Sequence, residues 1–309
     1  MCTSCGCQGQ GTTMTNLQTG ASAEIAGPEH GRHGHGHSHG AGDHGHDHSR
    51  GEHHHAHEEH HHAHGIDHSH AHSHDHSHHD HAHEHSHGRV DMEARILAKN
   101  DAIAAKCRAW LAGREIVALN LLSSPGAGKT TLLERAITDL SCELPLFVIE
   151  GDQATSNDGE RIRAAGGPVV QVNTGTGCHL DAEMIARALS ELKPSVGSLV
   201  FIENVGNLVC PALFDLGEHA KAVTFSTTEG EDKPLKYPHM FSAAKVVIFN
   251  KIDLLPHLDF SMERARENVL RVNPDAEIVE VSAKTGAGMQ ALYGWIRAQL
   301  TAAKQSILV

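Results

Sequence analysis

Hydrophobic positions divide the chain sharply near residue 90. Before that point apolar residues are rare and follow neither a helical nor a strand period, whereas the remainder alternates apolar runs with amphipathic stretches. The second part, residues 90–309, has ordinary globular composition and is long enough to bury one sizeable core. We therefore expect one folded domain over residues 90–309, preceded by an N-terminal tail.

The apolar runs of this predicted domain are short, rich in β-branched residues and continuously apolar. They lie at 116–122, 146–149, 169–172, 199–202, 223–225, 246–249 and 278–281. Strands covered on both faces show such runs instead of an alternating pattern. Helical periodicity appears between them, at 90–111 and near 130–141, 155–165, 179–192, 260–272 and 288–303. The pattern predicts a doubly wound α/β domain with a mostly parallel sheet.

Histidine dominates residues 30–88, since 27 of the 31 histidines lie before residue 90 among Gly, Ser and Asp. A stretch of this composition buries nothing, and we expect it to be disordered without metal. Neutral imidazole suits nickel, copper and zinc, and the irregular spacing predicts storage or buffering instead of one defined site. Residues 1–29 are expected to form a cysteine motif followed by a polar linker.

Charge and aromatic content argue against a nucleic-acid-binding protein. Residues 1–89 hold 11 acidic and 3 basic residues, the remainder holds 27 and 22, and aromatic residues make up 4%. A nucleic-acid-binding domain would present a basic face.

No run approaches the roughly 18 consecutive apolar residues of a membrane span. The N-terminus shows no secretory signal, so the seven cysteines indicate reduced thiols or metal ligands. We expect a cytoplasmic protein.

A glycine-rich loop, SSPGAGKTT at 123–131, lies between the first predicted strand and a helical stretch. In this context backbone N–H groups and the helix N-terminus bind phosphates. Lys129 would reach the β- and γ-phosphates, and the Thr130 hydroxyl would bind Mg²⁺. Ser123 stands where the usual motif has its first glycine. The residues predicted to bind the nucleotide here are Gly126, Ala127, Gly128, Lys129, Thr130 and Thr131.

Two later motifs indicate that the base is guanine. NKID at 250–253 follows the strand KVVIF, and SAK at 282–284 follows IVEV. A carboxylate at Asp253 can accept from both the N1–H and the exocyclic amine of guanine, a pair that adenine does not offer. A backbone N–H of the SAK loop would meet the guanine carbonyl. The predicted base-binding residues are Asn250, Lys251, Asp253, Ser282, Ala283 and Lys284.

Two strands between these motifs end in acidic residues suited to the γ-phosphate. Glu150-Gly151-Asp152 follows LFVI, and Glu203-Asn204-Val205-Gly206 follows LVFI. The second block resembles the D-x-x-G switch of GTPases with Glu in place of Asp. Phosphoryl transfer depends mainly on positioning and charge neutralisation, so we expect Glu203 and Gly206 to face the phosphates. Asp152 is the predicted water-orienting residue, and solvated acidic side chains are the alternative for both blocks.

Two sets of cysteine and histidine residues suggest metal binding. Cys2, Cys5 and Cys7 form C-x-x-C-G-C, which suits square-planar nickel or copper with nitrogen ligands as well as tetrahedral zinc. The pair Cys178-His179 and the residue Cys210 each follow a predicted strand. The carboxyl ends of parallel strands share one edge, so these donors are expected to converge beside the γ-phosphate.

Three donors leave a metal coordinatively open or shared with a second subunit. A loop that responds to GTP would then move a metal ligand. The alternative is two small buried thiols and a histidine at a helix start.

Taken together, CTSCGC, the His-rich run, SSPGAGKTT, EGDQAT, NTGTGCHLD, ENVGNLVCP, NKIDLL and SAKTG resemble the HypB family of nickel-insertion GTPases in [NiFe]-hydrogenase maturation. The resemblance implies a SIMIBI-class P-loop fold, slow Mg²⁺-dependent GTP hydrolysis and a homodimer favoured by GTP or metal. It also implies a HypA-type metallochaperone partner and the hydrogenase large-subunit precursor as client.

In some members of that family, residues matching Cys2, Cys5 and Cys7 form a high-affinity nickel motif. Residues matching Cys178, His179 and Cys210 form a Ni²⁺ or Zn²⁺ site at the dimer interface.

Other functions remain open at this stage. A urease-accessory or zinc-homeostasis GTPase belongs to the same class, although the separated Cys-His and Cys blocks disfavour it. A metal buffer with nucleotide-gated release is a second possibility, and a regulatory GTPase is a third. Removal of residues 1–88 should abolish the function of a buffer and spare that of a GTPase chaperone.

Overall fold

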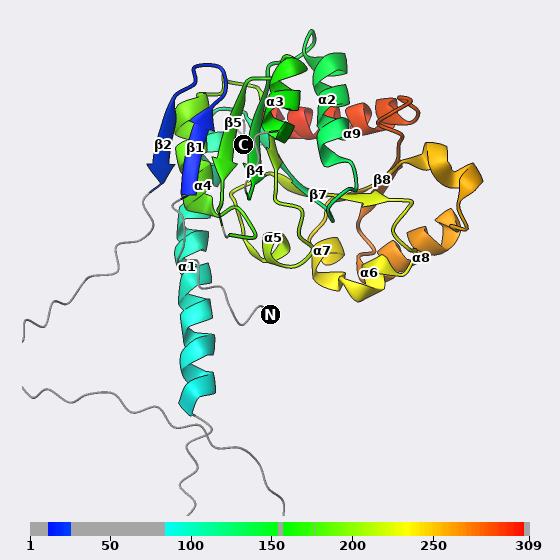
Figure 1. Cartoon of the computed structure of the whole chain (residues 1–309), viewed down its shortest axis with the longest axis horizontal. Coiled ribbons are helices and arrows are strands. Elements are labelled where there is room, and N and C mark those ends of the chain that lie inside the picture. Colours follow the sequence, from blue (N-terminus) through cyan, green and yellow to red (C-terminus); the bar gives the residue numbers. More distant parts are fainter. Residues whose placement is uncertain (1–11, 26–83, 154–156, 176, 306–309) are drawn as a thin grey trace, which may run out of the picture. The chain divides into compact units, whose positions relative to one another are not determined.

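The computed structural model describes residues 12–25, 84–153, 157–175 and 177–305 (Figure 1). The chain divides into two units, one formed by residues 1–28 with 89–309 and the other by residues 29–88. The sheet and the candidate site belong to the first unit. The predicted CTSCGC motif and most of the His-rich run lie outside the described residues. No helix of the described ranges combines the length and apolarity needed to cross a membrane.

The strands are β1 (Thr12–Asn16), β2 (Ser22–Ile25), β3 (Val117–Leu122), β4 (Leu146–Asp152), β5 (Val169–Asn173), β6 (Leu199–Glu203), β7 (Ala220–Ser226), β8 (Val246–Asn250) and β9 (Glu277–Glu280). The helices are α1 (Glu84–Ala112), α2 (Lys129–Leu140), α3 (Asn157–Ala164), α4 (Ala182–Leu192), α5 (Cys210–Leu213), α6 (Lys233–Lys236), α7 (Pro238–Ser242), α8 (Met262–Val272) and α9 (Met289–Gln305), with a 3₁₀ helix η1 (Ile252–His257).

These strands form one sheet in the order β2-β1-β5-β4-β6-β3-β7-β8-β9. All neighbouring pairs from β5 to β9 are parallel, and the β1 pairs with β2 and β5 are antiparallel. The predicted doubly wound, mostly parallel α/β fold is confirmed. Because parallel strands all end at one edge, the loops after β3, β4, β5, β6 and β8 gather there.

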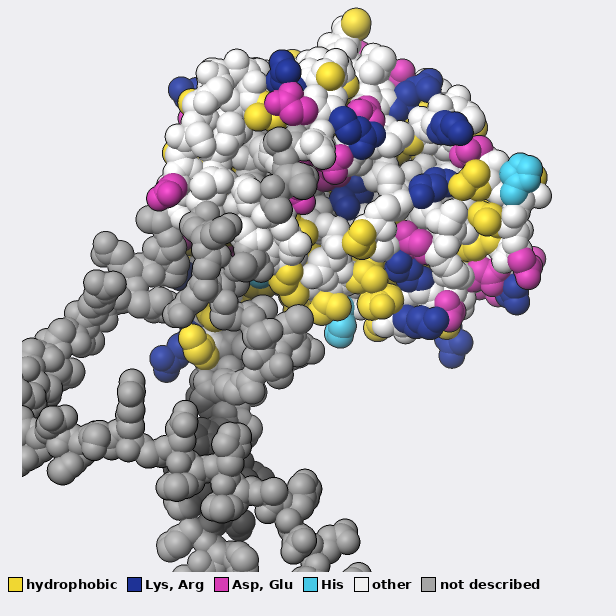
Figure 2. All heavy atoms as spheres, in the orientation of Figure 1, with side chains coloured by type: hydrophobic (Ala, Val, Ile, Leu, Met, Phe, Trp, Pro, Cys, Tyr) yellow, Lys and Arg dark blue, Asp and Glu magenta, His cyan; other side chains and the backbone are white. Residues whose placement is uncertain are grey.

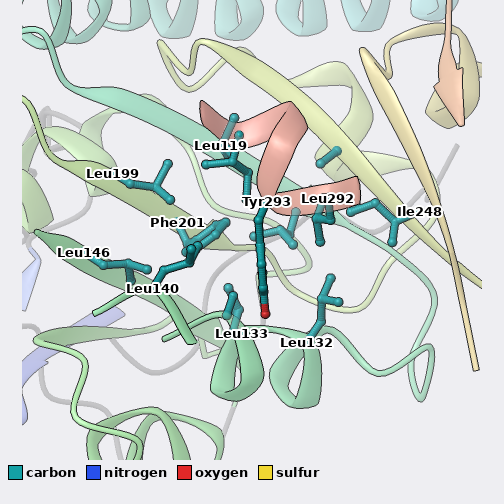
Figure 3. Close-up of a cluster of buried hydrophobic side chains, with 14 of the residues drawn as sticks. Leu119, Leu132, Leu133, Leu140, Leu146, Leu199, Phe201, Ile248, Leu292 and Tyr293 are labelled. Carbon is teal, nitrogen blue, oxygen red and sulfur yellow. The ribbon is translucent and has the colours of Figure 1, made fainter. Parts of the chain in front are cut away.

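The two faces of the sheet are covered by different helices. Leu119 and Leu121 of β3 pack in the same core as side chains of α2 and α9, whereas Ala118 joins the core formed with α1 and α4. Figure 3 shows the first core, in which Tyr293 of α9 lies among leucines of α2 and the strands. Covering on both faces explains why the strands are continuously apolar in sequence.

The expectation of a polar linker within residues 1–29 is wrong for residues 12–25. Thr12–Asn16 and Ser22–Ile25 form a hairpin whose first strand pairs with β5, with Met14 opposite Val172. Met14 and Ile25 are buried in the core with α4. The strands are short and mostly polar, because an edge hairpin buries only alternate side chains. The folded domain therefore also contains residues that precede the His-rich run.

Candidate nucleotide and metal site

The loop between β3 and α2 has the geometry of a phosphate-binding loop. Gly126 and Gly128 have φ of 74° and 95°, which is left-handed backbone that favours glycine. Lys129 and Thr130 begin α2 and are buried, and Lys129 Nζ donates to Ser123 Oγ at 2.7 Å. Burial lowers the pKa of Lys129, while Glu203 and other nearby carboxylates act in the opposite direction. The side chain is thus a buried amine with few partners, placed where a phosphate would be bound.

Asn250 ties the two predicted base-binding loops to the phosphate loop. Its Nδ2 donates to Ala127 O at 3.0 Å, and its Oδ1 accepts from Ala283 N at 3.1 Å. Lys251 Nζ donates to Gly126 O at 2.7 Å. A Cβ on Gly128 would lie 2.6 Å from Asn250 Nδ2, so only glycine permits this approach.

Asp253 and Ser282 complete the base-binding region. Ser282 Oγ donates to Asp253 Oδ1 at 2.6 Å, which orients the carboxylate, and Ser282 Oγ also accepts from Thr285 N at 3.1 Å. Lys284 follows on the exposed side of the same loop. The structure therefore brings the GAGKTT, NKID and SAK segments together at one edge of the sheet.

Two buried carboxyl groups, Glu150 on β4 and Glu203 on β6, lie opposite each other in the parallel register. Thr130 Oγ1 donates to Glu203 Oε1 at 2.8 Å. Burial raises the pKa of Glu150 to about 9, aided by the Glu203 charge, and burial raises the pKa of Glu203 to about 7 against the opposing effect of Lys129.

Glu150 Oε2 and Glu203 Oε2 are buried without a hydrogen-bond partner. Carboxylate and hydroxyl oxygens are ligands that Mg²⁺ prefers, so Thr130, Glu203 and the adjacent Glu150 fit this ion.

Asp152 lies two residues beyond Glu150 on β4 and therefore projects to the same face of the sheet. It is half-buried, its Oδ1 accepts from Gln153 N at 2.7 Å, and its charge raises the pKa of Glu150. The structure thus places Asp152 next to the acidic pair.

Cys178, His179 and Cys210 form a three-donor cluster. Their ligand atoms all lie within 4.8 Å of one another, and Cys178 Sγ is 3.6 Å from His179 Nδ1. Among the described residues no other group of three Cys, His, Asp or Glu donors meets this distance. Burial lowers the pKa of His179, which favours the neutral imidazole that binds metals. The ring of Phe214 lies 3.9 Å from that of His179, centroid to centroid, and limits its orientation.

One loop joins the two regions. It leaves β6 at Glu203, passes Gly206 and enters α5 at Cys210. A Cβ on Gly206 would lie 3.2 Å from Pro125 Cα, so the loop packs directly against the phosphate loop. The predicted convergence of Cys178, His179 and Cys210 is present as the three-donor cluster, and the loop that carries Cys210 also packs against the phosphate loop at Gly206.

Several contacts of this site were not predicted. The sequence indicates Glu150 as one of the acidic strand-end residues suited to the γ-phosphate, but not that it is buried opposite Glu203. Lys233 Nζ donates to Ser124 Oγ at 2.6 Å, and Ser124 Oγ donates to Glu229 Oε2 at 2.6 Å, so the loop after β7 also contacts the phosphate loop. The only sequence feature that indicates this contact is the polar stretch TTEGEDK, which directly follows a strand.

An apolar surface patch surrounds the end of α5. Val209, Leu213, Leu235 and Tyr237 expose 39%, 45%, 42% and 36% of their surface. Figure 2 shows hydrophobic side chains, in yellow, gathered over α5 to α7 in the lower part of the view. Val209 directly precedes the candidate metal donor Cys210, and Leu213 lies three residues after it.

Comparison with known proteins shows which family the chain is similar to. Residues 117–280 match the model of the family described as CobW/HypB/UreG, nucleotide-binding domain. The chain is 56% identical over 218 residues to the hydrogenase maturation factor HypB of Rhizobium leguminosarum bv. viciae, covering 71% of this chain and 72% of that protein.

Two solved structures are similar to this chain. The first is HypB from Archaeoglobus fulgidus, with TM-score 0.62 and 37% identity, covering 66% of this chain and 100% of that one. The second is HypB from Helicobacter pylori in complex with nickel, with TM-score 0.62 and 36% identity, covering 66% and 96%. The chain therefore belongs to the HypB family of hydrogenase maturation factors, within the wider CobW/HypB/UreG family of nucleotide-binding domains.

Proposed function

We propose that this chain is a GTP-hydrolysing nickel chaperone that stores nickel and delivers it to the large-subunit precursor of a [NiFe]-hydrogenase. The observation that supports it best is the loop from Glu203 to Cys210. Its first residue is bonded to Thr130 of the phosphate site, and its last belongs to the three-donor cluster. Any displacement of this loop by the γ-phosphate would change the position of a metal donor. Nickel is the cargo of this reaction, and a HypA-type metallochaperone is the proposed partner.

In this proposal the protein binds GTP through residues that the fold has already ordered. The phosphate loop and Lys129 hold the phosphates, while Asp253 recognises guanine with its carboxylate already oriented by Ser282. Thr130 and Glu203, with Glu150 adjacent, would hold Mg²⁺. When bound, that ion would neutralise phosphate charge during attack by water.

Asp152 is the proposed orienting group for the attacking water. It lies on the same face as Glu150 and remains more exposed to solvent. Breaking the bond between the γ-phosphorus and the β–γ bridging oxygen requires that this water be aligned and lose a proton. Asp152→Asn should lower kcat for GTP hydrolysis at least about tenfold with little change in GTP affinity, as measured by single-turnover hydrolysis and equilibrium binding. An equal loss in the exposed Asp275→Asn, or none in Asp152→Asn, would contradict this role.

The proposed metal site uses Cys178, His179 and Cys210 for Ni²⁺, with Zn²⁺ as a competing ion. Two thiolates and one imidazole leave at least one coordination position open for a second subunit. The apolar patch around α5 supports a homodimer at this face, favoured by GTP or metal. In the same proposal Cys2, Cys5 and Cys7 form a separate nickel site, and the His-rich run stores nickel.

The decisive experiment measures Ni²⁺ affinity of the cluster with GDP and with a non-hydrolysable GTP analogue plus Mg²⁺. The full chain is required, because removal of residues 1–88 would delete the β1–β2 hairpin from the sheet. In a chain with Cys2, Cys5 and Cys7 replaced by Ser, the thiolate-to-nickel absorption band reports nickel bound at the cluster. Nickel bound only by histidines does not produce this band.

We expect nucleotide to change the affinity and Cys210→Ala to abolish the change. The exposed Cys142→Ala is the control. Equal affinities with both nucleotides would mean that nucleotide hydrolysis and metal binding are separate functions.

A further inference from the structure

Asn204 lies where the nucleotide and metal regions meet. It directly follows Glu203, and its side chain is 1% exposed. Its Oδ1 accepts from Val205 N at 3.0 Å and from Leu180 N at 3.2 Å. Leu180 directly follows His179. One buried carboxamide thus joins the loop after β6 to the loop that carries Cys178 and His179.

The other end of the same amide is anchored in the centre of the sheet. Asn204 Nδ2 donates to Asn120 Oδ1 at 3.2 Å, and Asn120 Nδ2 donates to Glu218 Oε1 at 3.2 Å. Asn120 is on β3, three residues before the phosphate loop begins, and is fully buried. Because every polar atom of the Asn204 amide has a described partner, turning it would leave buried groups unsatisfied, at about 1–3 kcal/mol each.

A second branch of the network reaches the aromatic ring that packs against His179. Glu218 is paired with Lys221 at 3.2 Å, and Lys221 Nζ donates to Phe214 O at 3.1 Å. Phe214 is the residue whose ring covers the His179 imidazole. Both the backbone next to His179 and the ring against it are therefore connected to the Asn204–Asn120–Glu218 chain of hydrogen bonds.

This path passes through fewer residues than the covalent one from Glu203 to Cys210. The covalent path passes through Gly206 and a turn closed by Asn207 N to Val205 O at 2.7 Å, and Val209 is exposed. Rotation about the backbone of such a segment absorbs part of a displacement, so Cys210 moves less than the start of the loop. The side-chain path needs only Asn204 and one hydrogen bond to reach the residue next to His179.

We propose that Asn204 is a positioning residue that transmits the position of Glu203 to His179, so that the state of the nucleotide site sets the geometry of the metal donors. The proposal rests on the proposed function above and assigns its mechanical link to one side chain. Coupling between two sites typically corresponds to a 5- to 150-fold change in affinity.

The test compares Asn204→Ala with Asn100→Ala in the full chain with Cys2, Cys5 and Cys7 replaced by Ser. Asn100 is a matched control, because it is also a buried amide, and its Oδ1 accepts from Ala182 N, the first residue of α4 and two residues after Leu180, at 2.9 Å. Its Nδ2 donates to Asp215 O, and within the described residues its side chain has no hydrogen bond to residues 204–209 after β6. Ni²⁺ affinity is titrated by the thiolate-to-nickel band with GDP and with the GTP analogue, and GDP affinity is measured in parallel.

GDP should bind equally well to all three chains. In the parent chain and in Asn100→Ala, we expect Ni²⁺ affinity to differ about fivefold or more between GDP and the GTP analogue. In Asn204→Ala the effect should fall below about twofold. A nucleotide effect that survives Asn204→Ala overturns this inference alone. Equal Ni²⁺ affinities in the parent chain overturn the proposed function, and this inference with it.

Amide hydrogen exchange on the unaltered chain tests the same link if Asn204→Ala does not fold. The Leu180 N–H, bonded to Asn204, should change its exchange rate about tenfold or more between GDP and the GTP analogue. The Ala182 N–H, bonded to Asn100, should change much less. An unchanged Leu180 rate overturns the inference.

Discussion

Three ionisable side chains, Lys129, Glu150 and Glu203, are buried together in the phosphate site. Burial disfavours the charged form of each, and the carboxyl groups lack partners for one oxygen apiece. An arrangement of this kind is unfavourable until a phosphate and a cation occupy it. The affinity of the site for its ligand and the instability of the empty site therefore have the same origin.

The acidic pair predicts that the free energy of unfolding of the nucleotide-free protein depends on pH. An unfolded carboxyl ionises near its ordinary pKa of 4.5, whereas folded Glu203 and Glu150 keep a proton to about pH 7 and about pH 9. Between pH 4.5 and these raised pKa values of about 7 and about 9, the folded state binds more protons than the unfolded state. The stability of the folded state therefore falls as pH rises. The slope is at most about 1.4 kcal/mol per pH unit for each group.

Denaturant unfolding between about pH 5.5 and about pH 8 measures this slope. Glu150→Gln should reduce it, and the exposed Glu267→Gln on α8 should leave it unchanged. An identical slope in wild type and Glu150→Gln would show that Glu150 ionises normally in the folded chain.

In the proposed function Asp253 selects the base, and a single substitution should change that preference. Asp253→Asn loses two charge-assisted hydrogen bonds to guanine, so GTP affinity should fall about 100-fold or more. Xanthine carries a carbonyl in place of the amine and should bind the Asn variant better than the parent. Competition of both triphosphates against a fluorescent GDP derivative measures the preference. The exposed Asp259→Asn is the control, and a variant that loses both ligands would indicate a structural role instead.

At the scale of elements, the phosphate loop depends on a close approach to β8. Gly128→Ala would place a Cβ against Asn250 Nδ2, in addition to the about 1–2 kcal/mol of left-handed backbone strain. Asn250 would have to move away from Ala127 and Ala283, and GDP affinity should fall about 10- to 100-fold.

Gly166→Ala is the matched control, since Gly166 has φ of 93° and nothing within 4 Å of an added Cβ. It should lower the unfolding temperature through the same strain but leave GDP affinity unchanged. Similar GDP affinities in both variants would rule out the contact with Asn250 as the cause.

The sequence predicted the strands of residues 116–305 well, because burial on both faces leaves an unambiguous apolar run. It also predicted the longer helices, but the short helices α5, α6, α7 and η1 are too brief to show a helical period. The hairpin of residues 12–25 escaped detection, since TTMTN and SAEI bury little and carry no strong period. For the site, motifs indicated which loops converge. They did not indicate Glu150 opposite Glu203, the Lys233–Glu229–Ser124 contacts or the Asn204 amide. Those depend on the register between strands distant in sequence, which no local pattern encodes.

At the scale of the whole molecule, the apolar patch around α5 predicts how copies associate. Leu213→Asp would place a charge on a face proposed to be buried in the dimer, so self-association with the GTP analogue and Ni²⁺ should weaken at least about tenfold. Leu270→Asp is the control, because Leu270 is similarly exposed, at 43%, but lies on α8. Sedimentation at several concentrations measures the constant. Equal weakening in both variants, or none in Leu213→Asp, would exclude this face.

The hairpin also changes the relation of the His-rich run to the rest of the chain. Ile25 ends β2 and Glu84 begins α1, so the intervening residues are an insertion into the folded domain and not a free N-terminal extension. A single peptide-bond cleavage within the insertion would therefore leave the β1–β2 hairpin as a separate fragment. Noncovalent contacts alone, among them its backbone hydrogen bonds to β5 and the burial of Met14 and Ile25, would then hold it in the sheet.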